Sequence, residues 1–268
     1  MDSKITAQTD SVYRLACLEL HGGNHLASYP AELPGLAGWI SCRPLRPAAK
    51  GGDLYYLSAC SQGVIARVAL ADVAGHGEAV SAAAVRLQHA LRAHLDEWDQ
   101  ALLVRQLNDT LLDTAEDGRY ATAFLASYCS TSGELLFTNA GHLPPLWYRA
   151  ARAEWNWLHD VTLLSTSVAD LPLGLIAGTA YSQMAVQLDP GDLLVLYTDG
   201  ISESLDKSGE QLGLDRLLSI AHSLPTESST AAGQALLTAI ENFRSGVPPA
   251  DDETVVALQR LPSIPQKK

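Results

Sequence analysis

The sequence is poor in cysteine and in positive charge, and it has no long apolar run. None of its four cysteines forms a Cys-x-x-Cys pair, so we interpret them as buried or free thiols in a reducing compartment rather than a disulfide framework or a zinc site. Lysine and arginine number 18 against 30 aspartates and glutamates, giving a net charge of -12 that argues against nonspecific nucleic-acid binding. No apolar run approaches the roughly 18 residues of a membrane span, and the N-terminus lacks a hydrophobic signal core. These absences predict a soluble cytoplasmic protein with neither a nucleic-acid nor a membrane partner.

Several familiar sequence patterns are also missing. We find no Ser-His-Asp order, no phosphate-binding P-loop and no dinucleotide-binding fingerprint. There is no internal repeat, long linker or heptad array. The chain of 268 residues is 47% hydrophobic, which is enough for a sizeable core and for one large domain or two small ones.

The hydrophobic pattern predicts an alternation of strands and helices. The continuous apolar run from Val64 to Ala71 indicates a strand that is buried on both faces. Two hairpins are expected, one joining 121–128 to 134–139 and one joining 184–188 to 193–197, and the strands 146–148 and 155–158 are expected to pair around a polar loop. The remaining expected strands are 12–20 (an edge strand), 37–42, 54–60, 146–148, 155–158 and 254–258, and the expected helices are 79–95, 100–112, 212–221 and 230–243. This order favours α+β layers over a parallel βαβ sheet.

Four aspartates lie in short motifs that are typical of metal sites. Asp53 follows two glycines, and Asp252 lies in an acidic loop after a double proline. Asp72 and Asp199 follow the apolar runs 64–71 and 193–197, where a charge is costly unless it is paired or bound to a cation. Carboxylates with few His or Cys partners suit Mg²⁺ or Mn²⁺ rather than zinc. The recurrence of a carboxylate at a strand end is the main indication of an enzyme.

Each motif taken alone also has a purely structural interpretation. Asp72 precedes a Gly-x-Gly turn, and it would be favoured near the N-terminus of a following helix in any protein. Asp199 with its glycine fits an ordinary turn, and Asp252 fits a solvated acidic loop. The polar loop from Asn139 to His142 fits a site wall and a rigid turn equally well. His142 and His76 could transfer protons, or they could be hydrogen-bonded structural groups.

Five motifs in their order along the chain resemble those of the SpoIIE/RsbU-type serine phosphatases, a bacterial branch of the PP2C-like (PPM) metal-dependent phosphatases. The motifs are Gly51 to Asp53, Asp72 to Gly77, Asn139 to His142, Tyr197 to Gly200, and Asp251 to Thr254. The ordered set is far more specific than any one of its members.

The resemblance implies a fold and a set of ligands. The expected fold is an α+β, four-layer α-β-β-α sandwich of two antiparallel sheets flanked by helices. The expected cofactors are two Mn²⁺ or Mg²⁺ ions. By position, Asp72 would bridge both ions with help from the Val73 carbonyl, Asp53 would hold one ion, and Asp199 and Asp252 would hold the other. Asp72 and Asp199 are therefore the candidate catalytic residues.

The resemblance also implies a reaction and a partner. A hydroxide-like water between the metals would attack the phosphorus of a phosphoserine or phosphothreonine in line, without a covalent phosphoenzyme. The implied substrate is a phosphorylated protein, such as a STAS-domain anti-anti-sigma factor in bacterial signalling.

The sequence departs from the family pattern at several positions. Tyr56 stands where the family often has a second acidic residue, and Ala74 stands where eukaryotic relatives have a histidine that can act as general acid. His76 is displaced from that position. Arg46 and Lys50 are only near the place of an arginine that binds phosphate in those relatives. Leaving-group protonation and phosphate binding stay unassigned, but all four primary ligands are present, which favours an active enzyme.

The resemblance covers residues 33–261, which we expect to form the phosphatase domain. Residues 1–32 are expected to be an N-terminal extension with an added edge strand, and 262–268 a frayed tail. Two other functions stay open. The chain could be a noncatalytic PP2C-like module that binds a regulator, or a metal-dependent hydrolase of small phosphate compounds.

Overall fold

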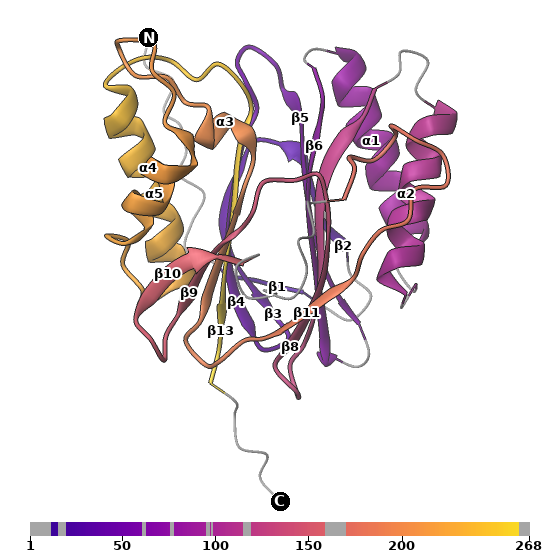
Figure 1. The fold of residues 1–268 in the computed structure, drawn as a ribbon, viewed down its shortest axis with the longest axis horizontal. Helices are drawn as coiled ribbons and strands as arrows, with labels where there is room; N and C mark the ends of the chain where they lie inside the picture. Colours follow the sequence, from indigo (N-terminus) through magenta and orange to yellow (C-terminus); the bar gives the residue numbers. More distant parts are fainter. Residues whose placement is uncertain are drawn as a thin grey trace, which may run out of the picture.

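The computed structural model of this chain describes residues 12–15, 20–60, 63–75, 78–94, 97, 99–114, 119–158 and 170–262. These residues form two β-sheets that pack face to face, with helices on both outer faces (Figure 1). The strands are β1 (Tyr13–Arg14), β2 (Leu20–His25), β3 (Ala27–Leu33), β4 (Leu36–Arg43), β5 (Lys50–Cys60), β6 (Ile65–Val73), β7 (Ala121–Cys129), β8 (Glu134–Ala140), β9 (Leu146–Arg149), β10 (Glu154–Trp157), β11 (Met184–Gln187), β12 (Leu193–Tyr197) and β13 (Glu253–Arg260). The helices are α1 (Glu78–Ala93), α2 (Gln100–Thr114), α3 (Asp199–Ser202), α4 (Gly213–Ala221) and α5 (Ser229–Arg244).

The two sheets differ in size and contain strands from distant parts of the chain. The seven-stranded sheet has the order β1-β3-β4-β13-β12-β9-β10, and the six-stranded sheet has the order β11-β8-β7-β6-β5-β2. All ladders between these strands are antiparallel except the short parallel pairing of β1 with β3. The expected sandwich of two antiparallel sheets is confirmed.

Side chains that alternate along each central strand fill different layers of the core. In β13, Val256 and Leu258 face the other sheet, whereas Val255 and Ala257 pack under the helices on the outside. Successive residues of a strand point to opposite faces of the sheet. A strand that is covered on both faces must therefore be apolar at every position. This explains the continuous apolar runs that mark β6, β12 and β13.

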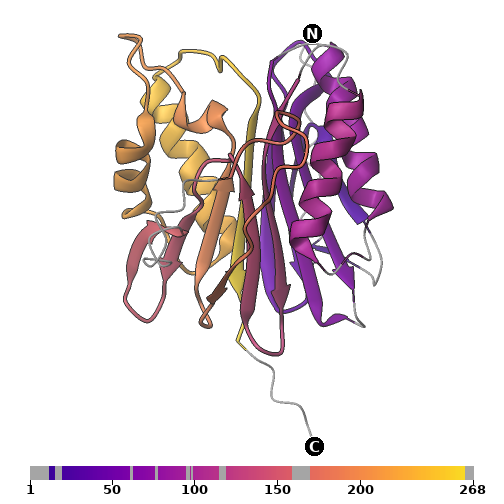
Figure 2. The same ribbon diagram turned by 45° about the vertical axis from the view of Figure 1, so that its right-hand side comes forward.

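The helices pack in pairs on the outer faces of the sandwich. Helices α1 and α2 cover the six-stranded sheet through residues such as Leu87 and Leu107, which are both buried. Helices α4 and α5 cover the seven-stranded sheet through residues such as Leu217 and Leu236. Figure 2 shows the magenta pair over one face and the orange and yellow pair over the other. No helix among the described residues is long and apolar enough to cross a membrane.

One of the two expected hairpins is wrong, whereas the other hairpin and the expected pairing of β9 with β10 are confirmed. Strands β7 and β8 pair antiparallel as expected. Strands β11 and β12 do not pair, because β11 joins β8 in the six-stranded sheet while β12 lies between β13 and β9 in the other sheet. The connection between them passes from one sheet to the other.

The turn between β11 and β12 contains the reason for this crossing. Asp192 is only 2% exposed, and its carboxylate accepts hydrogen bonds from the indole of Trp147 at 3.1 Å and from the Ala150 amide at 2.8 Å. Both partners lie in or next to β9, so the buried carboxylate ties the start of β12 to that strand. A turn that looks local in sequence is thus fixed by tertiary hydrogen bonds.

The segments before residue 33 take part in both sheets. Strand β2 pairs with β5, and β3 pairs with β4 around the turn at Pro34 and Gly35. Of the edge strand expected over 12–20, the described part forms only the short β1, and residues 16–19 lie outside the described residues. A domain boundary at residue 33 stays a prediction.

Candidate metal centre

Two of the four aspartates face each other at the end of the six-stranded sheet. Asp53 in β5 and Asp72 in β6 are direct neighbours in the antiparallel ladder. Residues two apart in a strand point to the same face of the sheet. Asp53 therefore shares a face with Tyr55, and Asp72 shares a face with Leu70, and both Tyr55 and Leu70 face the other sheet. The two carboxylates therefore point into the space between the sheets.

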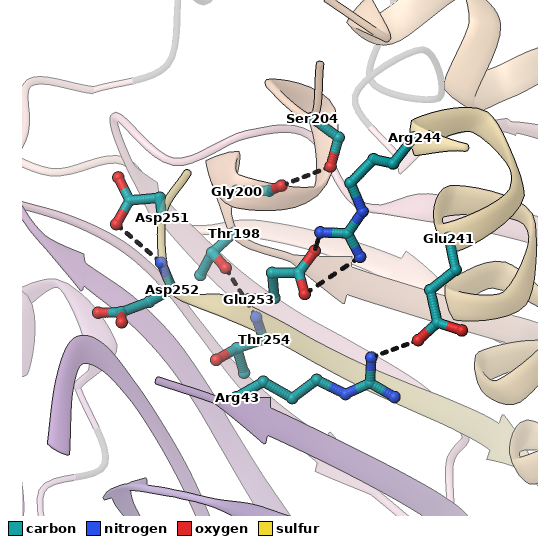
Figure 3. Close-up of polar contacts among 10 residues, drawn as sticks. All are labelled: Arg43, Thr198, Gly200, Ser204, Glu241, Arg244, Asp251, Asp252, Glu253 and Thr254. Carbon is teal, nitrogen blue, oxygen red and sulfur yellow. Dashed lines mark hydrogen bonds and ion pairs between the residues drawn. The ribbon is translucent and has the colours of Figure 1, made fainter. Parts of the chain in front are cut away.

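The other two aspartates come from the same end of the seven-stranded sheet. Asp199 is the first residue of α3 and follows β12 after the single residue Thr198, and Asp252 directly precedes β13. The Thr198 amide donates a hydrogen bond of 3.1 Å to the Thr254 carbonyl, which holds the two segments together. A side chain at Gly200 would collide with the Asp252 carbonyl, so only glycine fits there. Figure 3 shows these segments side by side.

A buried threonine connects Asp53 to the opposite sheet. The Thr198 hydroxyl donates a hydrogen bond of 2.7 Å to Asp53 Oδ2 and accepts one of 3.0 Å from the Thr254 amide. Thr198 is fully buried, and Asp53 is 2% exposed. Burial, followed by the charge of Asp72, raises the pKa of Asp53 well above its usual range. Asp53 is thus held in one position, and its ionisation is energetically unfavourable unless a cation lies beside it.

Asp72 and Asp199 influence each other's protonation across the gap between the sheets. Burial, followed by the charge of Asp199, raises the pKa of Asp72 to about 7. Burial, followed by the charge of Asp251, raises the pKa of Asp199. Like charges this close cannot all ionise without a compensating positive charge. We call Asp53, Asp72, Asp199 and Asp252 the acidic cluster.

Asp252 is held by backbone amides. Its Oδ1 accepts a hydrogen bond of 2.6 Å from Leu45, and its Oδ2 accepts one of 2.6 Å from Gly52. A side chain at Gly51 would collide with the same carboxylate, and a side chain at Gly52 would collide with Val80, which explains the two glycines before Asp53. Among the described residues, no three acidic, His or Cys side chains lie close enough together to hold a metal ion as they stand.

The donor set of the acidic cluster fits a hard divalent cation. It supplies carboxylate oxygens only, the ligands preferred by Mg²⁺ and Mn²⁺. Cys42 lies near Asp53, but burial, followed by the Asp53 charge, raises the pKa of its thiol to about 12, so it is not a thiolate ligand. The backbone carbonyl of Val73, the residue after Asp72, would lie 3.0 Å from a side chain at Gly52, the residue before Asp53. The mutual repulsion of these carboxylates is what a cation would relieve.

Of the two candidate proton-transfer histidines, the structure describes only His142. His142 is 4% exposed, its Nδ1 lies 2.8 Å from the Thr122 hydroxyl, and its amide donates to Asn139 Oδ1 at 2.7 Å. Burial lowers the pKa of His142 to about 4, so it is neutral at pH 7. This favours the structural interpretation of the Asn139 to His142 loop. His76 lies outside the described residues.

The positions that depart from the family pattern take different places. Tyr56 is 5% exposed and packs in the core under α1 and α2, on the face of β5 opposite to Asp53. Ala74 is partly buried, and its amide donates to the Tyr120 carbonyl at 2.9 Å. Arg46 is exposed in the loop that follows β4, and Lys50, the first residue of β5, is exposed as well.

Sequence reasoning missed three contributors to the site. Thr198 directly precedes Asp199 and could have been noticed as a polar residue that ends an apolar strand. Asp251 affects the pKa of both Asp72 and Asp199, and its adjacency to Asp252 was the available signal. The Leu45 amide has no sequence signal, because a backbone group is brought there only by the path of its loop.

Comparison with known proteins yields one family and a set of relatives. The sequence model of the family described as Stage II sporulation protein E (SpoIIE) matches residues 65–261, which is most of the chain. The phosphoserine phosphatase RsbU of Bacillus subtilis is 25% identical over 171 residues, which cover 62% of this chain and 48% of RsbU. The chain thus corresponds to about half the length of that relative.

Solved structures share the fold at low sequence identity. The RsbU and RsbW domains of Rv1364c from Mycobacterium tuberculosis match with a TM-score of 0.71 and 24% identity, covering 90% of this chain and 64% of that one. The PP2C phosphatase domain of SpoIIE from Bacillus subtilis, with a fragment of its regulatory domain, matches with a TM-score of 0.69 and 21% identity, covering 84% and 63%. The catalytic domain of the serine threonine protein phosphatase PstP, in complex with 2 manganese ions, matches with a TM-score of 0.56 and 17% identity, covering 85% and 99%.

The fold is therefore PP2C-like, and the match over residues 65–261 shows that the chain belongs to the SpoIIE family.

Proposed function

We propose that this protein is a metal-dependent protein serine/threonine phosphatase. The observation that carries the proposal is the acidic cluster, in which Asp53 and Asp72 are neighbours in one sheet and the charges of Asp199 and Asp252, next to the other sheet, act on Asp72. The raised pKa of Asp72, about 7, indicates that its site needs a proton or a cation. Such a site in a member of the SpoIIE family supports hydrolysis of a phosphate monoester.

The chain's own residues would hold two Mn²⁺ or Mg²⁺ ions. Asp53, Asp72, Asp199, Asp252 and the Val73 carbonyl are the proposed ligands, with Asp72 and Asp199 as the catalytic carboxylates. When bound, such ions supply a hydroxide-like water and offset the charge of the phosphoryl oxygens. The manganese named with PstP supports this choice of metal.

The surrounding groups orient the ligands before any ion arrives. Thr198 fixes one oxygen of Asp53 at 2.7 Å. The amides of Leu45 and Gly52 fix both oxygens of Asp252 at 2.6 Å. Ligands held in this way lose little conformational entropy on binding a cation, which favours a defined metal geometry.

The proposed substrate is a phosphoserine or phosphothreonine on a protein. The name of RsbU, a phosphoserine phosphatase, supports this class. We extend the proposal to a STAS-domain anti-anti-sigma protein in cytoplasmic signalling, the partner that the family resemblance implies. Incubation with a phosphorylated STAS protein, with phosphopeptides, and with nucleotides and sugar phosphates tests this choice. Turnover of the small phosphates alone would favour the small-molecule hydrolase instead.

Hydrolysis of p-nitrophenyl phosphate tests the chemistry without a protein partner. We expect turnover that requires added Mn²⁺, stops with EDTA, and falls by at least roughly 1,000-fold in Asp72→Asn, because a neutral amide cannot hold the cation. The control is Asp189→Asn, an exposed aspartate in the turn between β11 and β12, which we expect to keep wild-type activity.

Two outcomes would contradict the proposed function. Full activity in Asp72→Asn would exclude the acidic cluster as the centre of the reaction. Absence of turnover on every phosphate tested, in folded wild-type protein that binds Mn²⁺, would favour the noncatalytic regulator-binding module.

A further inference from the structure

A groove lies beside the acidic cluster and extends away from it. It has a volume of about 700 Å³ and lies between the loop 43–46, which follows β4, and the loop 246–249, which follows α5. Its volume is within the range of protein sites that enclose a ligand. We call it the arginine groove, because Arg43, Arg46 and Arg244 all line it.

The arginine groove is continuous with the proposed metal centre. Asp251 lines one end of it and is the chain neighbour of Asp252. Leu45 lines it as well, and the Leu45 amide donates to Asp252 Oδ1 at 2.6 Å. A chain lying in the groove would therefore run directly into the acidic cluster.

Two ion pairs build the polar wall of the groove (Figure 3). Arg244 and Glu253 are 2.6 Å apart and nearly fully buried, with 5% and 2% of their side chains exposed. Arg43 and Glu241 are 2.7 Å apart at the exposed rim. A buried ion pair of this kind is held in place, because separating the partners would leave an unpaired charge in the protein interior. The wall is therefore a preformed surface whose own charges are matched.

Arg46 is the third arginine that lines the groove. Arg46 is exposed, and no carboxylate of the described part of the chain pairs with it. In a chain with a net charge of -12, such a cation beside a groove favours an acidic ligand.

The rest of the surface is apolar. Leu26 is 68% exposed at the rim, and Val247, Pro248 and Pro249 line the groove opposite the loop 43–46. An exposed leucine that lines a groove together with prolines is typical of a surface that binds another polypeptide.

We propose that the arginine groove binds the polypeptide segment that flanks the phosphorylated residue of the substrate, with an apolar side chain against Leu26 and Val247 and an acidic side chain at Arg46. The inference rests on the proposed function, because the phosphorylated residue itself would lie at the acidic cluster. It makes the groove a determinant of which phosphoproteins are accepted.

Two fluorescein-labelled phosphoserine peptides of equal length test the inference. One carries aspartate and leucine on both sides of the phosphoserine, and the other carries lysine and serine. Fluorescence anisotropy with EDTA present measures binding without turnover, and kcat/KM is then measured with Mn²⁺. We expect the wild type to prefer the acidic, apolar peptide by about 10-fold in both assays.

Two substitutions in the groove test whether it causes the preference between the peptides. We expect Arg46→Glu to abolish or invert the preference, and Leu26→Ser to reduce it by about 3-fold to 10-fold. The ratio between the two peptides is the measured quantity, so a general loss of activity cancels. The matched controls are Leu261→Ser, an exposed leucine just beyond the end of β13, and Arg152→Glu, in the turn between β9 and β10. Both are expected to keep the wild-type ratio.

Equal binding of the two peptides by the wild type, or an unchanged ratio in Arg46→Glu and Leu26→Ser, would overturn the inference. Failure of the proposed function is distinguishable from this result. In that case neither p-nitrophenyl phosphate nor either peptide is hydrolysed, while anisotropy with EDTA still decides whether the groove selects the acidic peptide.

Discussion

At the scale of the residue, the site is defined by carboxyl groups whose ionisation is energetically unfavourable. Burial and the neighbouring charge of Asp72 raise the pKa of Asp53, and Asp72 itself reaches about 7. A protein keeps such groups where a cation will compensate them. The same burial makes Thr198 necessary, because a buried carboxylate oxygen needs a donor when no water reaches it.

His142 lies close to this region and responds to pH in the opposite direction. Burial lowers its pKa to about 4 from 6.5. The unfolded chain therefore takes up a proton at a higher pH than the folded protein. The stability that the neutral ring contributes is complete above pH 6.5 and is lost as the pH falls toward 4.

We expect this loss to amount to about 2 kcal/mol between pH 7.5 and pH 5. Urea unfolding of the wild type and of His142→Asn at both pH values, with EDTA present, measures it. The raised pKa values of the acidic cluster act with the opposite sign in both proteins, so they cancel in the comparison. An equal change of stability with pH in the two proteins would contradict the assignment of a buried neutral ring.

At the scale of the element, strand ends place the site. Strand β12 ends at Tyr197 and α3 begins at Asp199, so Thr198 is the single residue between them. Its hydroxyl donates a hydrogen bond to Asp53 on β5 and accepts one from the Thr254 amide in β13. One hydroxyl thus joins three strands of two sheets. Its replacement affects the position of a ligand rather than the chemistry of the site.

Thr198→Val removes this hydroxyl at constant shape. We expect a loss of roughly 2–3 kcal/mol of stability, because Asp53 loses its donor and the Thr254 amide loses its acceptor. We also expect the Mn²⁺ concentration for half-maximal activity to rise about 10-fold, as the ligand is less well positioned.

Titration of phosphatase activity with Mn²⁺ and chemical denaturation measure the two effects of Thr198→Val. Thr198→Ser should restore both, since it keeps the hydroxyl. Thr238→Val is a matched control, because Thr238 on α5 is exposed and bonds only to the Gln234 carbonyl of its own helix. If Thr198→Val and Thr198→Ser reach half-maximal activity at the same Mn²⁺ concentration, the Thr198 hydroxyl does not position the ligand.

The elements themselves follow closely from the hydrophobic pattern. Helix α5 and strands β6 and β13 lie within a few residues of the expected ranges, because their apolar spacing matches one type of structure only. Pairing of strands is less local. The segments 184–188 and 193–197 look like a hairpin, yet the contacts of Asp192 with Trp147 and Ala150 send the second strand to the other sheet.

At the scale of the whole molecule, the sandwich brings its ligands from both sheets to one end. Asp53 and Asp72 belong to the six-stranded sheet, and Asp199 and Asp252 adjoin the seven-stranded sheet. Cations held by these four carboxylates would connect the two halves of the core. An unfolded chain presents no such set of ligands, so the cation binds only the folded state.

We therefore expect Mn²⁺ to stabilise the whole molecule. At a concentration of 100 times its Kd the gain is about 2.7 kcal/mol, which corresponds to a rise in Tm of roughly 5–10 °C for a domain of this size. Thermal unfolding with Mn²⁺ and with EDTA measures it, and Asp189→Asn should show the same rise.

Asp72→Asn should lose the rise in Tm and should also be more stable than the wild type when EDTA is present at pH 8. The reason is that the wild-type carboxylate, with its pKa of about 7, is charged at pH 8 without a counter-ion. An equal response of Asp72→Asn and the wild type to Mn²⁺ would show that the metal binds elsewhere.

The sequence by itself determined most of the strands and helices, though not β2, β3 and α3, together with the α+β class and the aspartates as candidate ligands through their ordered motifs. These properties depend on local spacing and on residue type, which the chain carries directly. Only the tertiary structure decided which strands pair, that Thr198 supports Asp53, that the Leu45 amide binds Asp252, and that the loops after β4 and α5 enclose a groove. Each of these joins residues far apart in the chain, and such contacts depend on the packing of two sheets rather than on any local pattern.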